Sequence, residues 1–248
     1  MTLIALRSPQ SARDVVRAAC AEFSGSLAIL TSFQREGVVI VDLALQADHT
    51  IPVMTIDTGR LPTGTLQMIA SIEQRFGITV RRILPEPAEV NAMVDTLGRD
   101  LFYQGMAERR LCCNIRKVRP LAQAMQNVRA YFTGLRRAHS ETRATTEFVD
   151  RSGSPVKISP LADWTAEEVA NYTLANGLPE HPLYAAGYTS IGCDPCTRAV
   201  AAGEDERAGR WWWEQDTAKE CGLHFTPEGN VERTVDVLLR DVLSKVHV

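Results

Sequence analysis

Five of the six cysteines in the sequence form a pattern that predicts chemistry. Cys112 and Cys113 are adjacent, and Cys193 and Cys196 are separated by two residues. Four thiolates with this spacing can hold a metal ion or an iron–sulfur cluster. Cys221 stands apart in a polar segment, where a thiol can serve as a nucleophile. Four cysteines that bind and one that reacts predict an enzyme.

Spacing favours an iron–sulfur cluster over zinc at the four cysteines. Zinc sites usually take ligand pairs at Cys-x2-Cys-like spacing, because both thiolates must reach one tetrahedral ion. The adjacent pair Cys112–Cys113 makes this awkward. In a [4Fe-4S] cluster each iron takes one thiolate, so adjacent cysteines can bind different corners. Zinc is the alternative. Cys20, in the first predicted helix, is interpreted as an inert core residue.

The surroundings of Cys221 bear on its reactivity, because nearby cations lower the pKa of a thiol. Glu220 opposes this effect. Taken alone, Cys221 is as compatible with a spectator role as with a nucleophile, and the anion-binding signals below favour the nucleophile. The residues that could supply positive charge are Lys219, His224, Arg207 and Arg210.

Two turns predict contacts to an anionic ligand. Thr31, Ser32 and Phe33 follow the first predicted strand, and Asp57-Thr58-Gly59-Arg60 follows the second. In an open parallel sheet, ligands bind at the carboxyl ends of the strands, where helix N-termini offer free amides to phosphate or sulfate. Helix capping explains the Ser and Thr residues of one such turn equally well. Two such turns on adjacent strands favour binding.

A basic stretch, residues 134–143, is a third signal for an anion. Its arginines are Arg136, Arg137 and Arg143. Guanidinium forks pair well with phosphate and sulfate oxygens. A solvated run of charges is the alternative, but the stretch directly follows a predicted strand, which favours contact with a ligand.

Alternating strands and helices must position these residues. Short connections between them predict an α/β fold, with a mainly parallel sheet covered by helices on both faces and an irregular C-terminal segment. The predicted strands cover residues 26–31, 51–56, 78–84 and 131–133, and a hairpin is expected from 146–149 and 156–159. The predicted helices cover residues 11–23, 37–45, 63–76, 166–175 and 231–246.

The length allows one large domain or two small ones, and the order of the predicted elements favours a single domain over residues 1–248. Its core is expected at about 24–200, a catalytic C-terminal segment at about 201–225 and an extra helix at about 231–246. Apolar residues make up 45% and charged residues 23%, and the net charge of -3 gives no reason to expect nucleic acid. No stretch approaches the roughly 20 apolar residues that a membrane span needs. Without a signal peptide, a cytoplasmic location is expected.

In chain order, these motifs resemble the assimilatory sulfonucleotide reductases, specifically the adenylyl-sulfate (APS) reductase branch. The resemblance runs from about Leu27 to His224. Any one motif could arise by chance, but the ordered set is highly specific. It rests on residues 31–33, 57–60, 112–117, 133–137, 191–198, 203–211 and 220–224.

The resemblance implies an adenine-nucleotide α-hydrolase-like fold and reduction of APS to sulfite and AMP. Cys221 would attack the sulfate sulfur to give an S-sulfocysteine, and thioredoxin or a similar dithiol would release sulfite. The four paired cysteines would hold a [4Fe-4S] cluster, which a related branch acting on the 3′-phosphorylated substrate (PAPS) lacks. Lys117, Arg207 and Arg210 would neutralise the phosphosulfate. The full set of implied substrate contacts is Thr31, Ser32, Phe33, Asp57, Thr58, Gly59, Arg60, Lys117, Arg136, Arg137, Arg143, Arg207, Arg210 and His224.

Three features depart from the family pattern. The turn at residues 34–37 differs from the more usual version, which contains glycine and ends in aspartate, and His139 stands where glutamine is commoner. The predicted helix after Cys221 is hypothesised to anchor the tail or to form a dimer interface, which would make the protein a homo-oligomer. The alternatives are a PAPS reductase, with Arg35 or Arg60 meeting the 3′-phosphate, an ATP-dependent pyrophosphatase-loop enzyme, and a four-cysteine zinc scaffold.

Overall fold

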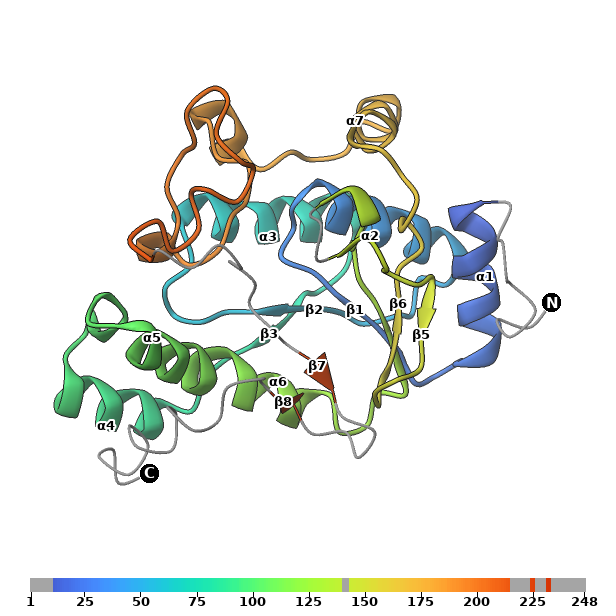
Figure 1. Cartoon of the computed structure of the whole chain (residues 1–248). Coiled ribbons are helices and arrows are strands. Elements are labelled where there is room, and N and C mark those ends of the chain that lie inside the picture. Colours follow the sequence, from blue (N-terminus) through green and yellow to red (C-terminus); the bar gives the residue numbers. More distant parts are fainter. Residues whose placement is uncertain (1–10, 140–142, 215–223, 226–230, 233–248) are drawn as a thin grey trace. The chain divides into compact units, whose positions relative to one another are not determined.

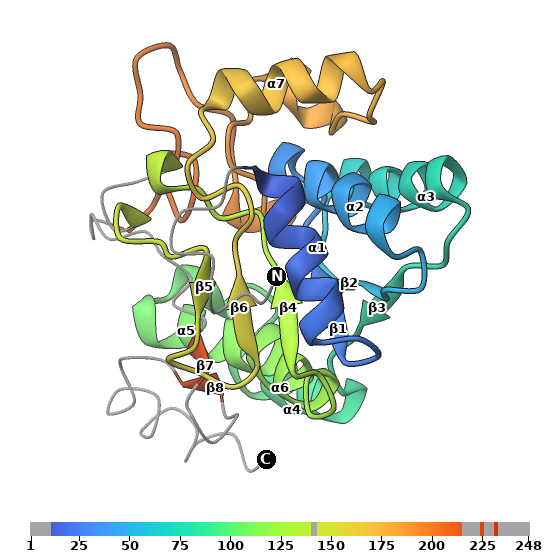
Figure 2. The same cartoon turned by 90° about the vertical axis from the view of Figure 1, so that its right-hand side faces the viewer.

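Short buried strands follow the apolar segments of the sequence and join into one six-stranded sheet. A computed structural model describes residues 11–139, 143–214, 224–225 and 231–232. The strand order is β3-β2-β1-β4-β6-β5, and the labels β5, β6, β4 and β1 run across Figure 2 in this order. The strands are β1 (Leu27–Leu30), β2 (Val53–Ile56), β3 (Arg81–Ile83), β4 (Ala130–Phe132), β5 (Val149–Asp150) and β6 (Val156–Ile158).

Pairing within the sheet is mainly parallel. Strand β1 pairs in parallel with both β2 and β4, and β4 pairs in parallel with β6. Strand β5 pairs antiparallel with β6, which is the predicted hairpin. Parallel strands need crossover connections, so residues at their carboxyl ends come from segments far apart in the sequence.

The chain divides into two compact units, and each is described by itself. Unit 1 contains residues 1–55, 63–81 and 127–184, and unit 2 contains residues 56–62, 82–126 and 185–248. The sequence predicts a single sulfonucleotide reductase domain over residues 1–248. This domain assignment stays a prediction.

The described part of unit 1 contains four α-helices. They are α1 (Ala12–Glu22), α2 (Arg35–Ala47), α3 (Thr63–Phe76) and α7 (Ala166–Ala175). In Figure 1, α2 lies next to the strands and α7 lies beyond α2. Helix α7 begins with the predicted capping box: the Thr165 hydroxyl accepts the Glu168 amide and the Glu168 carboxylate accepts the Thr165 amide. Helices α1 and α7 both pack on α2. The resulting core is aliphatic, with Val15, Ile29, Val39 and Ile72 fully buried.

Unit 2 is built around a continuous helical segment that the sequence analysis did not predict. Helix α5 (Met106–Cys113) passes through a π-helical turn (Asn114–Val118) into α6 (Arg119–Ala124). Helix α4 (Pro87–Leu97) and a 3₁₀ turn at Leu101–Tyr103 complete the helical part. The core of this unit combines thiols and aromatic rings: Met93, Leu101, Phe102, Leu111, Cys112, Ile115, Cys196 and Trp211.

The end of the chain differs from its prediction where it is described. Strands β7 (His224–Phe225) and β8 (Val231–Glu232) form an antiparallel pair, so the predicted helix does not begin at Val231. Residues 233–246 of that prediction lie outside the described residues. None of the described helices has the length and apolar character that crossing a membrane requires.

Candidate functional site

The two cysteine pairs converge inside unit 2 from two elements. Cys112 and Cys113 end helix α5, directly before the π-helical turn. Cys193 and Cys196 flank a 3₁₀ turn, and Cys196 packs in the same buried cluster as Cys112. A π-helical turn is rare and often marks a functional site. Cys112, Cys193 and Cys196 therefore lie in or against one buried cluster, and the role of the four cysteines as ligands of one group stays a prediction.

Burial makes these thiols hard to ionise. It is the main cause that raises the pKa of Cys112 to about 12, and it also raises the pKa of Cys193 and Cys196. Each of these three thiols would also be disfavoured as a thiolate by charge on another member of the set, Cys113 included. A bound positive group is needed to keep four such thiolates together. Among the described residues, no group of three or more His, Cys, Asp or Glu side chains is arranged to hold a single metal ion.

Buried polar atoms around the thiols test whether the site fits a further group. In the described part of unit 2, five buried side-chain atoms have no hydrogen-bond partner: Asn114 Oδ1, Arg116 Nε, Arg210 Nε, Trp211 Nε1 and Trp213 Nε1. Such orphaned atoms are rare in native proteins and indicate a missing ion, water or ligand. Four of the five are N–H donors, which suit a group rich in sulfur or negative charge. The donor set therefore fits an anionic iron–sulfur cluster.

The predicted turn Asp57–Arg60 holds the second cysteine pair. The Thr58 hydroxyl is hydrogen-bonded to Cys193 Sγ at 3.2 Å, and Arg60 O accepts the Asp194 amide at 2.8 Å. Gly59 has a φ of 70°, which favours glycine, and its amide donates to Asp57 Oδ1 at 2.9 Å. The sequence analysis predicted that this turn contacts the substrate. The structure shows that the turn also contacts Cys193 and its neighbour Asp194.

Two predicted cations lie near Cys193, and a third shares a hydroxyl partner with one of them. Lys117 and Arg210 both act to lower the pKa of Cys193, against the larger effect of burial. Nη1 of Arg207 and of Arg210 each lie 3.5 Å from the Ser190 hydroxyl. The Arg210 guanidinium lies against Gly192, so a side chain at residue 192 would displace it. Positive charge is thus gathered beside the thiols.

The turn after β1 shapes the corresponding edge of unit 1. Thr31 Oγ1 accepts the Phe33 amide at 2.9 Å, and Phe33 is fully buried with a strained φ of 56°. A side chain at Gly37 would collide with Thr31 Oγ1. The first amide of α2, that of Arg35, donates to the Tyr184 hydroxyl at 3.1 Å. One of the backbone amides that was predicted to bind an anion at the start of α2 is therefore already hydrogen-bonded within the protein.

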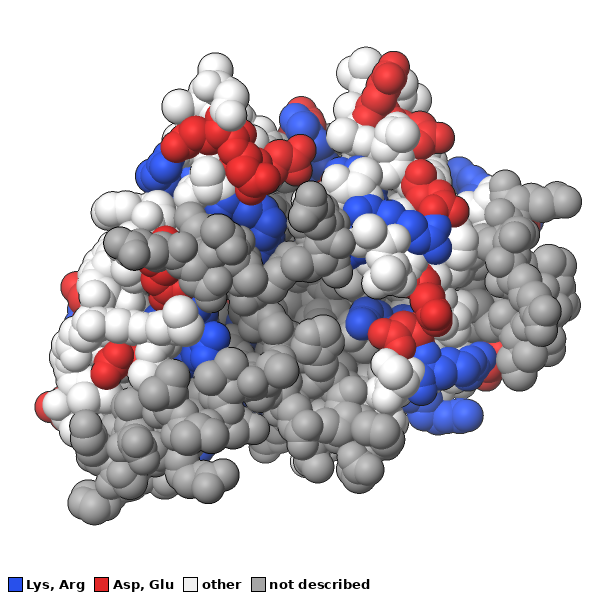
Figure 3. Space-filling model, in the orientation of Figure 1, with Lys and Arg blue, Asp and Glu red and all other residues white. Residues whose placement is uncertain are grey.

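The basic stretch is anchored by the carboxylates of unit 1. The buried Arg136 donates to Glu36 Oε1 at 2.9 Å and to Trp164 O at 3.2 Å, and Arg137 is paired with Asp163. Two arginines predicted to contact the substrate thus have internal partners, and their contacts to substrate stay a prediction. On the face drawn in Figure 3, basic and acidic side chains are interspersed, as such pairing requires.

The residues predicted for the site divide between the units. Thr31, Ser32, Phe33 and the arginines of the basic stretch belong to unit 1, and residues 57–60, Lys117, Arg207, Arg210 and the four cysteines belong to unit 2. Cys221 lies outside the described residues, as does the side chain of His224.

The sequence analysis missed a buried ion pair beside the thiols. Arg109 donates to both carboxylate oxygens of Glu214, at 2.6 and 2.8 Å, and its guanidinium lies 4.4 Å from the centre of the Trp211 ring. Arg210 also stacks on Trp211, at 4.8 Å. The three consecutive tryptophans, Trp211 to Trp213, were a signal that could have drawn attention to this segment.

Comparison with solved structures defines the fold class. A phosphoadenylyl-sulfate (PAPS) reductase from Candida auris superposes with a TM-score of 0.64 at 26% identity, covering 80% of this chain and 93% of that chain. Yeast FAD synthetase superposes with a TM-score of 0.52 at 14% identity, covering 76% of this chain and 66% of that chain, and shows the fold alone. The fold is therefore adenine-nucleotide α-hydrolase-like.

Sequence relatives then place the chain in a family. The model of the phosphoadenosine phosphosulfate reductase domain matches residues 26–199. Adenosine 5′-phosphosulfate reductases of Rhizobium meliloti and Allochromatium vinosum are 43% and 41% identical, covering 82% and 86% of this chain and 81% and 84% of theirs. The chain belongs to the phosphoadenosine phosphosulfate reductase domain family, which confirms the resemblance found in the sequence.

Proposed function

We propose that this protein reduces adenosine 5′-phosphosulfate to sulfite and AMP, in the assimilation of sulfate for cysteine synthesis. The observation that carries the proposal is the gathering of Cys112, Cys193 and Cys196 with Lys117 and Arg210 in unit 2, in a chain related to adenosine 5′-phosphosulfate reductases. Lys117, Arg207 and Arg210 would supply charge to stabilise a phosphosulfate and the leaving AMP.

Cys112, Cys113, Cys193 and Cys196 would hold a [4Fe-4S] cluster. The adjacent cysteines and the orphaned N–H donors both support this choice. When bound, the cluster would tune the electrostatic environment of the substrate. The Thr58 hydroxyl and the guanidinium of Arg116 would orient the sulfur ligands, since Arg116 is anchored to Thr58 O at 3.0 Å.

Cys221 would be the nucleophile. Its thiolate would attack the sulfur of APS and break the sulfur–oxygen bond to the phosphate, so that AMP leaves and an S-sulfocysteine forms. A dithiol such as thioredoxin would then attack Cys221 Sγ, releasing sulfite and forming a mixed disulfide. The second thiol of the dithiol resolves this disulfide, so the dithiol is oxidised as sulfur(VI) becomes sulfur(IV).

Two ion pairs support APS rather than PAPS as the substrate. Arg35 and Arg60 are the cations that the sequence offered for a 3′-phosphate. Arg35 is held by Glu180 at 2.5 Å, and Arg60 is held by Asp100 at 2.8 Å. A cation already paired with a carboxylate has less charge to offer a phosphate. We also propose a cytoplasmic location, and a homo-oligomer in solution.

Anaerobic sulfite release with reduced thioredoxin, on APS and PAPS side by side, tests the function. Strong preference for APS is the expected result, and preference for PAPS would make the protein a PAPS reductase with a cluster. ATP consumption without sulfite release would favour the pyrophosphatase-loop alternative. A colourless protein with stoichiometric zinc and no sulfite release would favour the scaffold.

A further inference from the structure

The turn that carries the second cysteine pair is hydrogen-bonded to a tyrosine far away in the sequence. The Tyr103 hydroxyl donates to the backbone carbonyl of Pro195 at 3.0 Å, across 92 residues of sequence. Pro195 lies between Cys193 and Cys196, and Tyr103 ends the 3₁₀ turn that precedes helix α5. The hydrogen bond therefore joins two segments of unit 2 that lie far apart in the chain.

The ring of Tyr103 is held in place by two other aromatic rings. Its centre lies 4.6 Å from the centre of the Phe102 ring and 4.5 Å from that of the Trp213 ring. Phe102 belongs to the same buried cluster as Cys112 and Cys196. Trp213 packs against this cluster. Because the ring is held on two sides, its hydroxyl group is directed at Pro195 before any ligand binds.

Arg60 links the same turn to the residues just before Tyr103. Its carbonyl accepts the Asp194 amide at 2.8 Å. Its guanidinium donates to the carbonyl of Arg99 at 2.7 Å and to the carboxylate of Asp100 at 2.8 Å. Both residues between Cys193 and Cys196 are therefore connected to residues 99–103, Asp194 through Arg60 and Pro195 directly.

The first cysteine pair is attached to the same segment. Cys112 and Cys113 end helix α5, and α5 packs on the 3₁₀ turn that contains Tyr103. Residues 99–103 thus contact the elements that carry both cysteine pairs. A group that binds four thiolates requires both pairs at one particular separation.

We infer that Tyr103 is a positioning residue for the four cysteines: its hydrogen bond to Pro195 holds the second pair at the separation from the first pair that a bound cluster requires. The inference rests on the proposed function, because the cluster belongs to that proposal. Tyr103 acts through the backbone of Pro195 and is not itself a ligand. Loss of residues that orient metal ligands commonly weakens metal binding about 10- to 100-fold.

Tyr103→Phe removes the hydroxyl and keeps the ring that packs on Phe102 and Trp213. Tyr103 is half-exposed, so this change opens no buried cavity. Full-length protein purified without oxygen and loaded with iron and sulfide should lose its cluster about tenfold faster in this variant. The decay of the visible absorption in the presence of an iron chelator measures the rate. A Tyr103→Phe variant that keeps its cluster as long as the wild type would overturn the inference.

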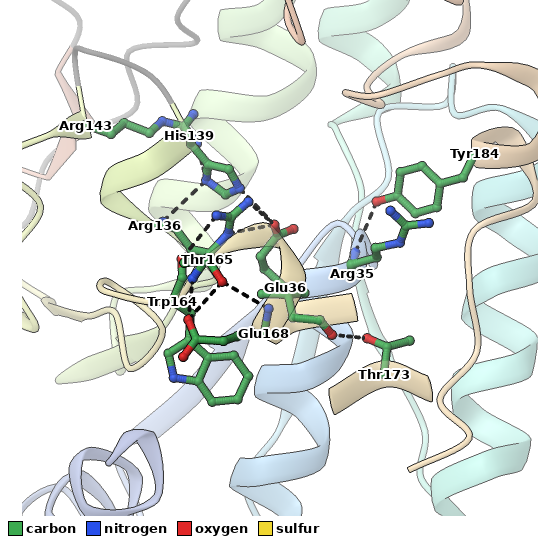
Figure 4. Close-up of polar contacts among 11 residues, drawn as sticks. Arg35, Glu36, Arg136, His139, Arg143, Trp164, Thr165, Glu168, Thr173 and Tyr184 are labelled. Carbon is green, nitrogen blue, oxygen red and sulfur yellow. Dashed lines mark hydrogen bonds and ion pairs between the residues drawn. The ribbon is translucent and has the colours of Figure 1, made fainter. Parts of the chain in front are cut away.

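Tyr184→Phe is the matched control. The Tyr184 hydroxyl is also bonded to a backbone group, since it accepts the Arg35 amide at 3.1 Å, but both residues belong to unit 1 (Figure 4). This variant should lose the cluster at the wild-type rate. Equal acceleration in both variants would mean that loss of either hydroxyl weakens the protein in general, and it would overturn the inference.

Thermal melts with and without the cluster separate positioning from general stability. If the hydroxyl only stabilised unit 2, Tyr103→Phe would lower the midpoint equally in the loaded and the unloaded protein. Positioning predicts a smaller rise of the midpoint on loading than in the wild type, because the variant binds the cluster less tightly. An equal rise would contradict the inference.

The proposed reaction and the role of Tyr103 can fail separately. A wild-type protein that takes up iron and sulfide but releases no sulfite from APS would refute the reaction, and the cluster lifetimes would still test Tyr103. A wild-type protein that takes up neither iron nor sulfide would refute the cluster and the inference together.

Discussion

The two units differ in how completely each satisfies its buried groups. In the described part of unit 1, the buried side-chain atoms without a hydrogen-bond partner are Glu22 Oε2 and Ser159 Oγ, and its core is aliphatic. In the described part of unit 2 there are five such atoms, around a core that contains thiols and tryptophans. The described core of unit 1 is thus almost fully satisfied by the protein's own groups. Unit 2 has the composition of a core completed by a bound group.

Loss of one cluster ligand should produce the largest difference in stability between the two units. Cys193→Ser should lose iron, sulfide and sulfite production together, because a cluster ligand is removed. Hydrogen exchange should then speed up in α4, α5 and α6 and change little in β1, β4 and α2. Cys20→Ser, a cysteine of unit 1 packed against the aliphatic core, is the matched control and should keep the cluster. Equal loss of protection in both units would contradict the comparison.

Removal of the nucleophile should leave both units intact. Cys221→Ser should lower turnover by at least about a thousandfold, because a hydroxyl cannot replace the thiolate. Iron content and the visible absorption of the cluster should remain at the wild-type level. Substantial sulfite production by this variant would show that Cys221 is not the nucleophile.

The buried ion pair of unit 2 should matter more than a surface pair of the same unit. Arg109→Leu leaves Glu214 buried without its partner and should cost about 3–5 kcal/mol of unfolding free energy. The Arg198–Glu204 pair is more exposed, at 41% and 34% of the two side chains, so Arg198→Leu should cost at most about 1 kcal/mol. Urea unfolding of both variants measures the difference. Similar costs would mean that the Arg109–Glu214 pair contributes no more than a solvated one.

A buried histidine should give unit 1 a modest pH dependence. Burial lowers the pKa of His181, which packs at the start of α3 and contacts Thr65 at 2.9 Å. Its neutral form is fully favoured above the ordinary histidine pKa of about 6.5, and stability falls as pH drops below it. Thermal melts from pH 8 to 5.5 should decline less in His181→Asn than in the wild type. His49, which is exposed, is the control, and His49→Gln should melt like the wild type at every pH.

Local patterns were sufficient for much of unit 1. The helix predicted at Thr63–Phe76 has these bounds, and the capping box begins α7 where it was expected. Apolar periodicity and capping act over a few residues, so the sequence itself displays them. The helical segment from Met106 to Ala124 was not predicted. Its π-helical turn and its charged residues, which include the buried Arg109 and Arg116, obscure the usual pattern.

The sequence by itself determined the chemistry: four paired cysteines, a set of arginines and an α/β order of elements, each readable from residue types and spacing. Only the tertiary structure decided which charges are used internally. Glu36 and Arg136 are 100 residues apart, and Arg109 and Glu214 are 105 residues apart. Pairing across such separations depends on which segments the fold brings together.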